Sequence, residues 1–304
     1  MREPVATIPR QMAALLNKLA PAEGYTRSLL EGVQFMRAER PLERTPVLYE
    51  PCIVIVCQGR KRGYLADKVY HYDQHHYLVL SVPLPFSTET EASPQRPLLA
   101  VAIALNMTVL SELVMALDRP GARASDAPEG IISTPLDEAL ADTTLRLLRA
   151  LAAPEEARLI GPQIVRELYY RVLVGERGNA LRAALAHQGH FARIAKSLQR
   201  IHHDYPRALS VATLAEDAGL SVPAFHKRFK AVTGTSPLQY IKSVRLNQAR
   251  LLMIRDDLSA ASAAFKVGYE SPSQFNREFR RFFGRSPGEE AREMKATFAL
   301  LPPV

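Results

Sequence analysis

The hydrophobic positions of the C-terminal region follow a helical spacing, and the same arrangement occurs twice. Residues 214–234 and 262–284 each show an apolar stripe that recurs every three or four positions, as one face of an α-helix requires. A repeat of this kind predicts a duplicated helical unit with its aromatic residues in the core. The aromatic residues at matching places in the two copies are Phe225, Phe229, Phe275 and Phe279.

Each copy also carries the residues that end one helix and begin the next. Gly219 and Gly268 can adopt the positive φ that terminates a helix, and Ser221 and Ser271 are good N-caps. Pro272 stands at the first helical position, where proline is well tolerated. The pattern therefore predicts two helix-turn-helix units.

The outward faces of the two second helices are basic and rich in hydrogen-bonding groups. In a helix-turn-helix this face enters the major groove, where Arg or Lys pairs with guanine and Asn with adenine. A single basic helix face is most often only a solvated face, but two copies in register favour DNA binding. The candidate DNA-contact residues are His226, Lys227, Lys230, Ser273, Gln274, Asn276, Arg277 and Arg280.

The segment between the copies, residues 236–256, predicts one long connecting helix that begins with an S-x-x-Q capping box. About 20 helical residues span about 30 Å, close to the ~34 Å between successive major-groove faces on one side of B-DNA. With GYESPSQFNREFRRFFGRSP at 268–287, this segment resembles the DNA-binding domain of the AraC/XylS family of bacterial transcription regulators over residues 190–295. The resemblance implies specific DNA binding by two helix-turn-helix subdomains. In departures from the family pattern, Pro223 replaces a larger contact residue and Glu290 an aromatic one.

Upstream, the pattern changes to that of short strands. Residues 41–105 contain the β-branched run CIVIVCQG, an alternating stretch around Ala66-Asp67, and the runs HYLVLSVPLPF and LLAVAIAL. Their spacing predicts a small barrel or sandwich. Over about residues 20–175 the chain resembles the N-terminal domain of one AraC subgroup, which implies a cupin-like effector or regulatory barrel.

Two helices are predicted after the strands. Leu136, Leu140, Leu147 and Leu151 share one helical face, and residues 155–174 predict a second helix. An apolar stripe of this kind either packs against the barrel or pairs with a second copy of the chain. The sequence leaves both interpretations open.

Charge divides the chain at the same place as the hydrophobic pattern. Residues 190–304 hold 18 Lys and Arg against 10 Asp and Glu, which accounts for the whole net charge of +8. We predict a regulatory, effector and dimerisation domain over 1–178, a linker over 179–189 and the DNA-binding domain over 190–304. The predicted fold class is α+β, with a cupin-like β-barrel and flanking helices followed by an all-α double helix-turn-helix.

The cysteine content and the longest apolar run bear on location. Two cysteines argue against a disulfide framework, and the N-terminus lacks the features of a secretory signal. The apolar stretch at 98–117 is interrupted by Asn106, Ser111 and Glu112, so it predicts a strand running into a helix. We expect a cytoplasmic protein with no membrane contact.

Three histidines in the segment HYDQHH, His71, His75 and His76, are candidate metal ligands, because cupin-like barrels sometimes hold metals through histidines. They lie in one turn-like segment without a distant carboxylate partner. Solvated or hydrogen-bonded loop histidines are the favoured interpretation, and we predict neither a metal nor a cofactor.

Cys52 and Cys57 are the other candidates for chemistry. On one strand they would point to opposite faces about 16 Å apart, which excludes a mutual disulfide. Buried inert thiols are the default interpretation. The alternative is a sensing thiol whose pKa is lowered by Arg60, Lys61 and Arg62 and which reacts with electrophiles or oxidants.

These patterns together predict a transcription regulator and no enzyme. The expected partners are double-stranded promoter DNA, RNA polymerase and a small-molecule or electrophilic effector of the N-terminal domain, with a homodimer as one assembly. One alternative is a cupin-type metalloenzyme fused to a DNA-binding module, which metal analysis would distinguish. Another is a structural nucleoid binder, which footprinting on random and promoter DNA would distinguish.

Overall fold

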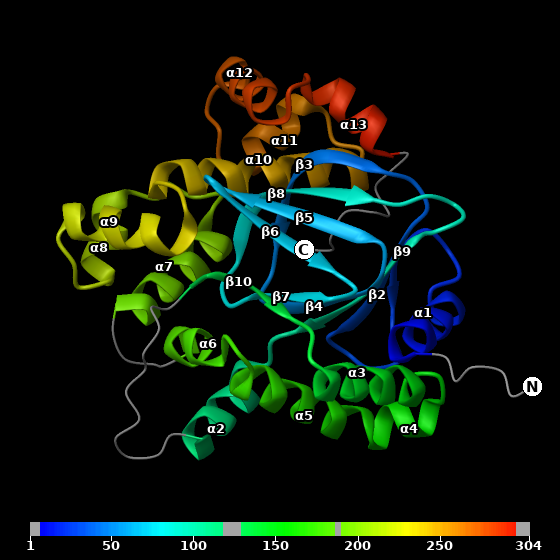
Figure 1. Ribbon diagram of the computed structural model, residues 1–304. Helices are drawn as coiled ribbons and strands as arrows, with labels where there is room; N and C mark the ends of the chain where they lie inside the picture. Colours follow the sequence, from blue (N-terminus) through cyan, green and yellow to red (C-terminus); the bar gives the residue numbers. More distant parts are fainter. Residues whose placement is uncertain (1–6, 118–128, 186–189, 296–304) are drawn as a thin grey trace, which may run out of the picture.

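The computed structural model describes residues 7–117, 129–185 and 190–295, which form a curled antiparallel sheet with helices on either side (Figure 1). The strands are β1 (Gly24–Arg27), β2 (Val33–Ala38), β3 (Leu42–Tyr49), β4 (Cys52–Gln58), β5 (Arg60–Leu65), β6 (Lys68–Asp73), β7 (His76–Leu80), β8 (Leu84–Glu91), β9 (Leu98–Ala104) and β10 (Ile131–Pro135). The helices before residue 186 are α1 (Ile8–Leu19), α2 (Met107–Leu117), α3 (Glu138–Ala150), α4 (Pro154–Leu159), α5 (Gly161–Val174) and α6 (Gly178–Leu185). None of the helices in these ranges is long and apolar enough to span a bilayer.

The strands form one sheet in the order β1-β2-β9-β4-β7-β6-β5-β8-β3, and β10 pairs with β7. The join between β6 and β7 rests on the single pair Asp73 and His76, so the sheet curls there into a half-barrel. Ala66, with φ of 51°, makes the tight turn between β5 and β6. The predicted barrel and its hairpin at Ala66-Asp67 are confirmed in this form.

A layer of helices covers the outer face of the sheet. Ile53, Ile55 and Cys57 of β4 point into a core shared with α1, α3 and α5, where Leu140 and Leu147 are fully buried. Burying such side chains stabilises the fold by roughly 1.5–3 kcal/mol each. The apolar stripe of the predicted helix therefore packs against the sheet.

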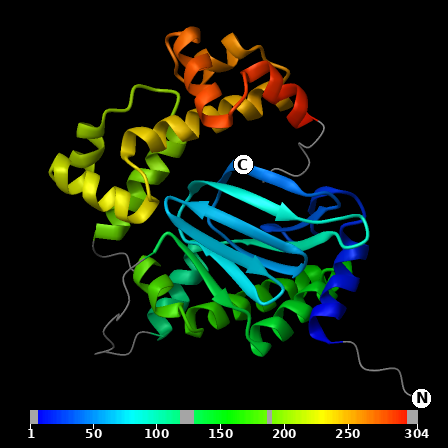
Figure 2. The ribbon, with the colours of Figure 1, turned by 45° about the horizontal axis from the view of Figure 1, so that its top comes forward.

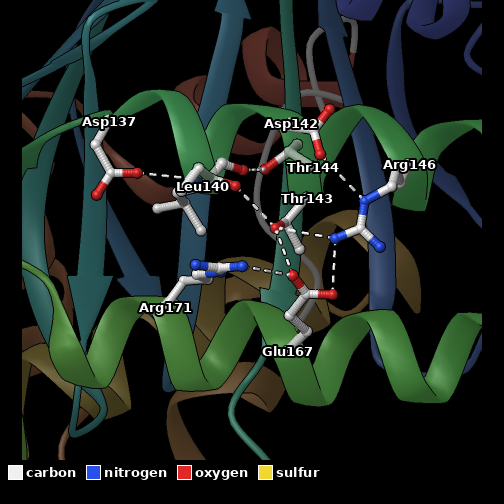
Figure 3. A network of polar contacts seen from close by, with 9 residues as sticks. Asp137, Leu140, Asp142, Thr143, Thr144, Arg146, Glu167 and Arg171 are labelled. Atoms are coloured by element: carbon white, nitrogen blue, oxygen red, sulfur yellow. Dashed lines mark hydrogen bonds and ion pairs between the residues drawn. The ribbon is translucent and has the colours of Figure 1, made fainter.

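A polar network joins α3 to α5 along the outer side of this layer (Figure 3). Arg146 donates to Glu167 at 2.7 Å and to Asp142 at 3.2 Å, and Arg171 donates to Glu167 at 3.1 Å. These groups are partly exposed, so each pair alone contributes little to stability. Arg146 on α3 and Glu167 on α5 form the ion pair that crosses between the two helices, whereas the pairs with Asp142 and Arg171 each lie within one helix.

The prediction of one helix over 155–174 was wrong in one respect. The chain forms α4 and then restarts as α5 at Gly161, with Ile160 between them. Pro162 lies in the first turn of α5 and has no amide hydrogen to donate to the preceding turn, so a continuous helix cannot form through it. The predicted end of this helix is confirmed, because α5 ends at Val174.

Between residues 190 and 295 the chain forms helices and no strand. They are α7 (His190–Asp204), α8 (Val211–Asp217), α9 (Val222–Thr233), α10 (Pro237–Arg255), α11 (Ala260–Lys266), α12 (Pro272–Phe283) and α13 (Pro287–Lys295). The long helix α10 crosses above the sheet and carries α7–α9 near one end and α11–α13 near the other (Figure 2). Helix α6 covers most of the predicted linker, and residues 186–189 of that linker lie outside the described residues.

The inner face of the sheet and the first helix-turn-helix share one hydrophobic core. Val54 and Leu80 of the sheet belong to the same cluster as Phe229 and Ile241 of the DNA-binding part. At the edge of this core, the Tyr240 hydroxyl donates to the Pro83 carbonyl at 2.7 Å. Helix α10 is therefore docked on the sheet by apolar packing and by a buried hydrogen bond.

Candidate nucleic-acid interface

Helix α9 is built as the recognition helix of the first unit. Ser221 caps its first turn by accepting from the Ala224 amide, and Gly234, with φ of 71°, ends it. Phe225 and Phe229 are fully buried at 0% exposure and fix which face of the helix points inward. The opposite face presents the predicted residues His226, Lys227 and Lys230 to solvent.

Helix α12 repeats this construction in the second unit. Ser271 caps it by accepting from the Gln274 amide, Gly284 ends it with φ of 81°, and Phe275 and Phe279 are fully buried. The predicted contact residues on this helix are all exposed: Ser273, Gln274, Asn276, Arg277 and Arg280. Asn276, Arg277 and Arg280 also line a groove of about 790 Å³ that reaches the start of α13. The two outward faces thus match in position and in chemistry.

The connection between the two units is a single helix. Helix α10 has 19 residues, begins at the N-cap Ser236 and ends at Asp256, as predicted. At 1.5 Å per residue it spans about 28 Å, and the distance between successive major grooves on one side of DNA is about 34 Å. The two recognition helices can therefore address neighbouring grooves.

Lys230 has a second environment besides solvent. It lines a cleft of about 310 Å³ between α9 and the β5–β6 hairpin, together with Asp67, Lys68 and Glu129. A Cβ atom added to Gly234 would lie 3.1 Å from Leu65 of the same hairpin. The end of the first recognition helix therefore lies against the sheet, whereas Lys227 is one helical turn farther from it.

A buried lysine lies inside the half-barrel. Lys61 is 3% exposed, and its Nζ donates to the Tyr49 hydroxyl at 3.0 Å and approaches Met36 Sδ at 3.6 Å. Its neighbours across the sheet are Tyr72 on β6, whose buried hydroxyl interacts with that of Tyr49, and Thr90 on β8, whose buried hydroxyl has no hydrogen-bonding partner within the described residues. Burial lowers the pKa of Lys61 to about 7.

Among the described residues, Lys61 forms no ion pair with a carboxylate. Arg60 and Arg62, its neighbours in sequence, point to the other face of β5 and pair with Glu91. The interior thus holds a Lys61 amine with a lowered pKa and a Thr90 hydroxyl that has no partner within the described residues. Buried polar groups of this kind are costly unless a ligand or water satisfies them.

The two cysteines lie on β4 and point to opposite faces of the sheet, as predicted. Cys52 belongs to the inner core and Cys57 to the outer core. Burial raises the pKa of both thiols to about 12, and Lys61 is the one predicted cation that lowers the pKa of Cys52. A thiol with a raised pKa is mostly protonated and reacts slowly.

The three predicted histidines are spread around the β6–β7 turn. His71 lies on β6, His75 in the turn contacts Gln74 at 3.1 Å, and His76 Nδ1 lies 3.1 Å from Asp73 Oδ1. Within the described residues, no three His, Cys, Asp or Glu side chains converge as a metal site would require. The hydrogen-bonded interpretation accounts for the contacts of His75 and His76.

Two comparisons with protein families identify the parts of the chain. Residues 29–180 match the family described as AraC-type transcriptional regulator N-terminus, and residues 214–293 match a helix-turn-helix domain family. The chain belongs to the AraC/XylS family of transcriptional regulators. Its two parts are the family's N-terminal regulatory domain and its helix-turn-helix DNA-binding domain.

Two relatives with similar sequences are described as transcriptional activators. The chain is 31% identical to RhaS of Escherichia fergusonii over 122 residues, which is 40% of this chain and 43% of RhaS. It is 35% identical to the RCS-specific activator RclR of Escherichia coli over 97 residues, 32% of this chain and 34% of RclR. The alignments thus span about a third to two fifths of the relatives' own length.

The whole fold also resembles a solved structure. ToxT from Vibrio cholerae O395, bound to (E)-4-(8-methylnaphthalen-1-yl)but-3-enoic acid, superposes with a TM-score of 0.59 over 89% of this chain and 99% of ToxT. The two sequences are 13% identical. The likeness confirms the arrangement of a curled sheet followed by a helical DNA-binding domain.

Several residues of the site were not identified from the sequence. Lys61 was grouped with Arg60 and Arg62 as one basic cluster, although the period-two alternation of a strand places it on the opposite face. That alternation was the signal that would have found it. No sequence pattern predicts the hydrogen bonds to distant carbonyls that are made by Arg245, Arg250 and Tyr240.

Proposed function

We propose that this regulator binds promoter DNA by inserting α9 and α12 into two neighbouring major grooves. The supporting observation is that all eight candidate residues are exposed on two matching helices carried by one rigid helix. Base contacts are assigned to Lys227, Asn276 and Arg277, and the remaining cations serve the phosphates. In this proposal the state of the N-terminal domain decides whether the Lys230 side chain lies in the cleft beside the sheet or faces the DNA.

Alanine at Lys227 or Arg277 is expected to weaken specific DNA binding by about 1–3 kcal/mol if the lost contact is to a base. Each side chain is exposed and outside the core, so the fold should remain intact. Gel-shift titrations on a DNA sequence selected by the wild-type chain measure the change.

The matched control is Arg158→Ala on α4, which removes an equal charge far from the DNA-binding helices. It should leave the affinity unchanged. Wild-type affinity in both Lys227→Ala and Arg277→Ala would contradict the assignment of these helices.

We assign the effector-binding site to the interior of the half-barrel. The effector itself is assigned to the class of small carboxylic acids with an apolar tail. Solved ToxT structures contain an unsaturated fatty acid or a substituted butenoic acid. In this chain Lys61 supplies an amino group that a bound carboxylate would keep protonated, and Tyr72 and Thr90 supply hydroxyls beside it. Because this interior core continues into α9 and α10, a bound acid would alter the docking of the DNA-binding domain.

Dodecanoate is expected to raise the melting temperature of the full-length chain, whereas dodecanol, which lacks the charge, is not. Lys61→Met should abolish the shift, and Lys18→Met, an exposed lysine on α1, should retain it. Equal shifts with dodecanol, or a full shift in Lys61→Met, would contradict the assignment.

The sensing role of Cys52 and Cys57 stays a prediction. The raised pKa of both thiols favours slow reaction with electrophiles, so a response would need an opening of the core. A reporter assay with Cys52→Ser and Cys57→Ser decides the question. An unchanged response to oxidants and electrophiles in both variants would remove the thiols from the mechanism.

The remaining assignments complete the proposal. The chain acts in the cytoplasm as a regulator without catalytic activity, recruits RNA polymerase and forms a homodimer, with domains over 1–178 and 190–304 joined by the linker at 179–189. Metal analysis of the purified protein tests the alternative of a fused metalloenzyme. A stoichiometric bound metal together with turnover of a substrate would favour that alternative.

A further inference from the structure

One arginine in the middle of α10 bonds to both helix-turn-helix units. The Arg245 guanidinium donates from Nε to the Tyr205 carbonyl at 2.8 Å and from Nη2 to the Arg207 carbonyl at 2.8 Å. Its third group, Nη1, donates to the Gly268 carbonyl at 3.0 Å. Tyr205 and Arg207 lie in the α7–α8 loop of the first unit, and Gly268 lies in the α11–α12 turn of the second.

The two units touch directly at this point. Gly268 has φ of 88°, and a Cβ atom added there would lie 2.4 Å from the Pro206 carbonyl oxygen and 3.1 Å from Arg245 Nη2. The Tyr205 ring packs against the cores of both units. Only a glycine permits this backbone approach, and Arg245 satisfies the carbonyls that surround it.

The contact is transmitted to both recognition helices. Gly268 comes shortly before the N-cap of α12, and Glu278 of α12 is held by Lys242 of α10 at 2.7 Å and by Tyr269 at 2.9 Å. On the other side, the loop bonded by Arg245 leads into α8, which packs against α9. The orientation of α9 relative to α12 therefore depends on the groups that Arg245 joins.

We propose that Arg245 is a positioning residue that sets the spacing between the two DNA segments the protein accepts. The proposal rests on the proposed function, in which α9 and α12 enter successive major grooves. Inserting one base pair moves the second groove by about 3.4 Å and rotates it around the DNA axis, which two rigidly joined helices cannot follow. A lysine cannot replace Arg245, because three carbonyls in different directions require the planar fork of a guanidinium.

The first experiment compares DNA spacings. A sequence selected by the full-length wild-type chain is shortened or lengthened by one and two base pairs between its two protected segments. The wild-type chain should lose about tenfold or more in affinity at each altered spacing. In Arg245→Met and Arg245→Lys the affinity for the native spacing should fall at least about fivefold, and the ratio between native and altered spacings should approach one.

Two further measurements distinguish a positioning role of Arg245 from an effect of its charge and from a general loss of DNA binding. Arg255→Met removes the same charge from the exposed end of α10 and should keep the wild-type spacing ratio. DNA with a single intact segment should bind the Arg245 variants as it binds the wild-type chain. A wild-type spacing ratio in both Arg245 variants would overturn the proposal.

The second experiment does not depend on DNA. Spin labels at Glu216→Cys on α8 and Lys266→Cys on α11, both exposed, report the distance between the two units in a Cys52→Ser, Cys57→Ser background. The distance distribution should be narrow with Arg245 and broader or displaced with Arg245→Met. If Arg245→Met loses its helical circular-dichroism signal, Arg245→Lys carries the same comparison. An unchanged distribution would overturn the proposal, whereas failure of the wild-type chain to select any DNA would overturn the proposed function alone.

Discussion

Glu290→Ala is expected to lower the free energy of unfolding by about 3–5 kcal/mol, because it leaves a buried arginine without its counter-charge. Glu290 and Arg250 are 4% and 2% exposed, and their side chains approach to 3.4 Å. The Arg250 guanidinium also lies 4.6 Å from the centre of the Phe283 ring and donates to the Pro46 carbonyl of β3 at 2.8 Å. Urea unfolding followed by circular dichroism measures the loss.

The reason for so large an effect is that both charges have lost their water. Burial lowers the pKa of Arg250 to about 10, although Glu290 acts against this lowering, so this side chain is charged at neutral pH. The double variant Arg250→Met, Glu290→Leu replaces the pair with apolar groups and should recover most of the stability. Glu293→Ala removes a surface partner of Arg285 and should cost less than about 0.5 kcal/mol. A loss below about 1 kcal/mol in Glu290→Ala would contradict the account of this pair.

Lys61→Met is expected to raise the free energy of unfolding by about 2–4 kcal/mol at pH 6–7. The folded-state pKa of about 7 lies below that of an unfolded lysine, ~10.4, so the unfolded chain binds more protons between these values. The wild-type chain therefore loses stability as the pH falls from about 10.4 to about 7, and this loss is constant below 7. Methionine carries no charge, so Lys61→Met removes this loss of stability. The substitution also removes the hydrogen bond to Tyr49.

The pH dependence makes this prediction specific. The gain from Lys61→Met should shrink steadily above pH 7 and vanish near pH 10.4. Lys18→Met, an exposed change, should show no such trend. Urea unfolding at several values between pH 6 and 10 provides the measurement, and a difference independent of pH would show that Lys61 is not desolvated in the folded chain.

The parts of the structure with local signals were predicted from the sequence. The caps Ser221 and Ser271 act on residues three positions away, and Gly219 and Gly268 adopt the expected positive φ of 59° and 88° after the first helices. Helix capping and hydrophobic periodicity depend on residues that are close in sequence, so both can be identified from the sequence alone. The DNA-facing residues followed from the same periodicity once the phenylalanines fixed the buried side.

The parts that depend on distant partners were not predicted. Strands β1, β2 and β10 are short, and the pairing of β2 with β9 and of β10 with β7 joins segments far apart in sequence. Glu290 was noted only as a departure from the family pattern, because its partner Arg250 lies on another helix. The core shared between the sheet and α9 likewise depends on how two domains dock, which propensity does not encode.

The position of Glu290 and Arg250 also bears on regulation. Arg250 joins the last helix of the DNA-binding domain, through Glu290, to β3 of the regulatory domain, through Pro46. Tyr240 makes a second such bond, to Pro83. A signal that moves the sheet would therefore act on α10, the helix that carries both recognition units.

Selection of DNA from a random pool by the full-length chain, followed by footprinting of the selected sequence, tests the central claim most directly. The account predicts an enriched sequence with two protected major-groove segments about 10 base pairs apart on one face of the duplex. Lys227→Ala should weaken protection of one segment and Arg277→Ala protection of the other. Binding without any enriched sequence, or protection that neither substitution alters, would contradict the account.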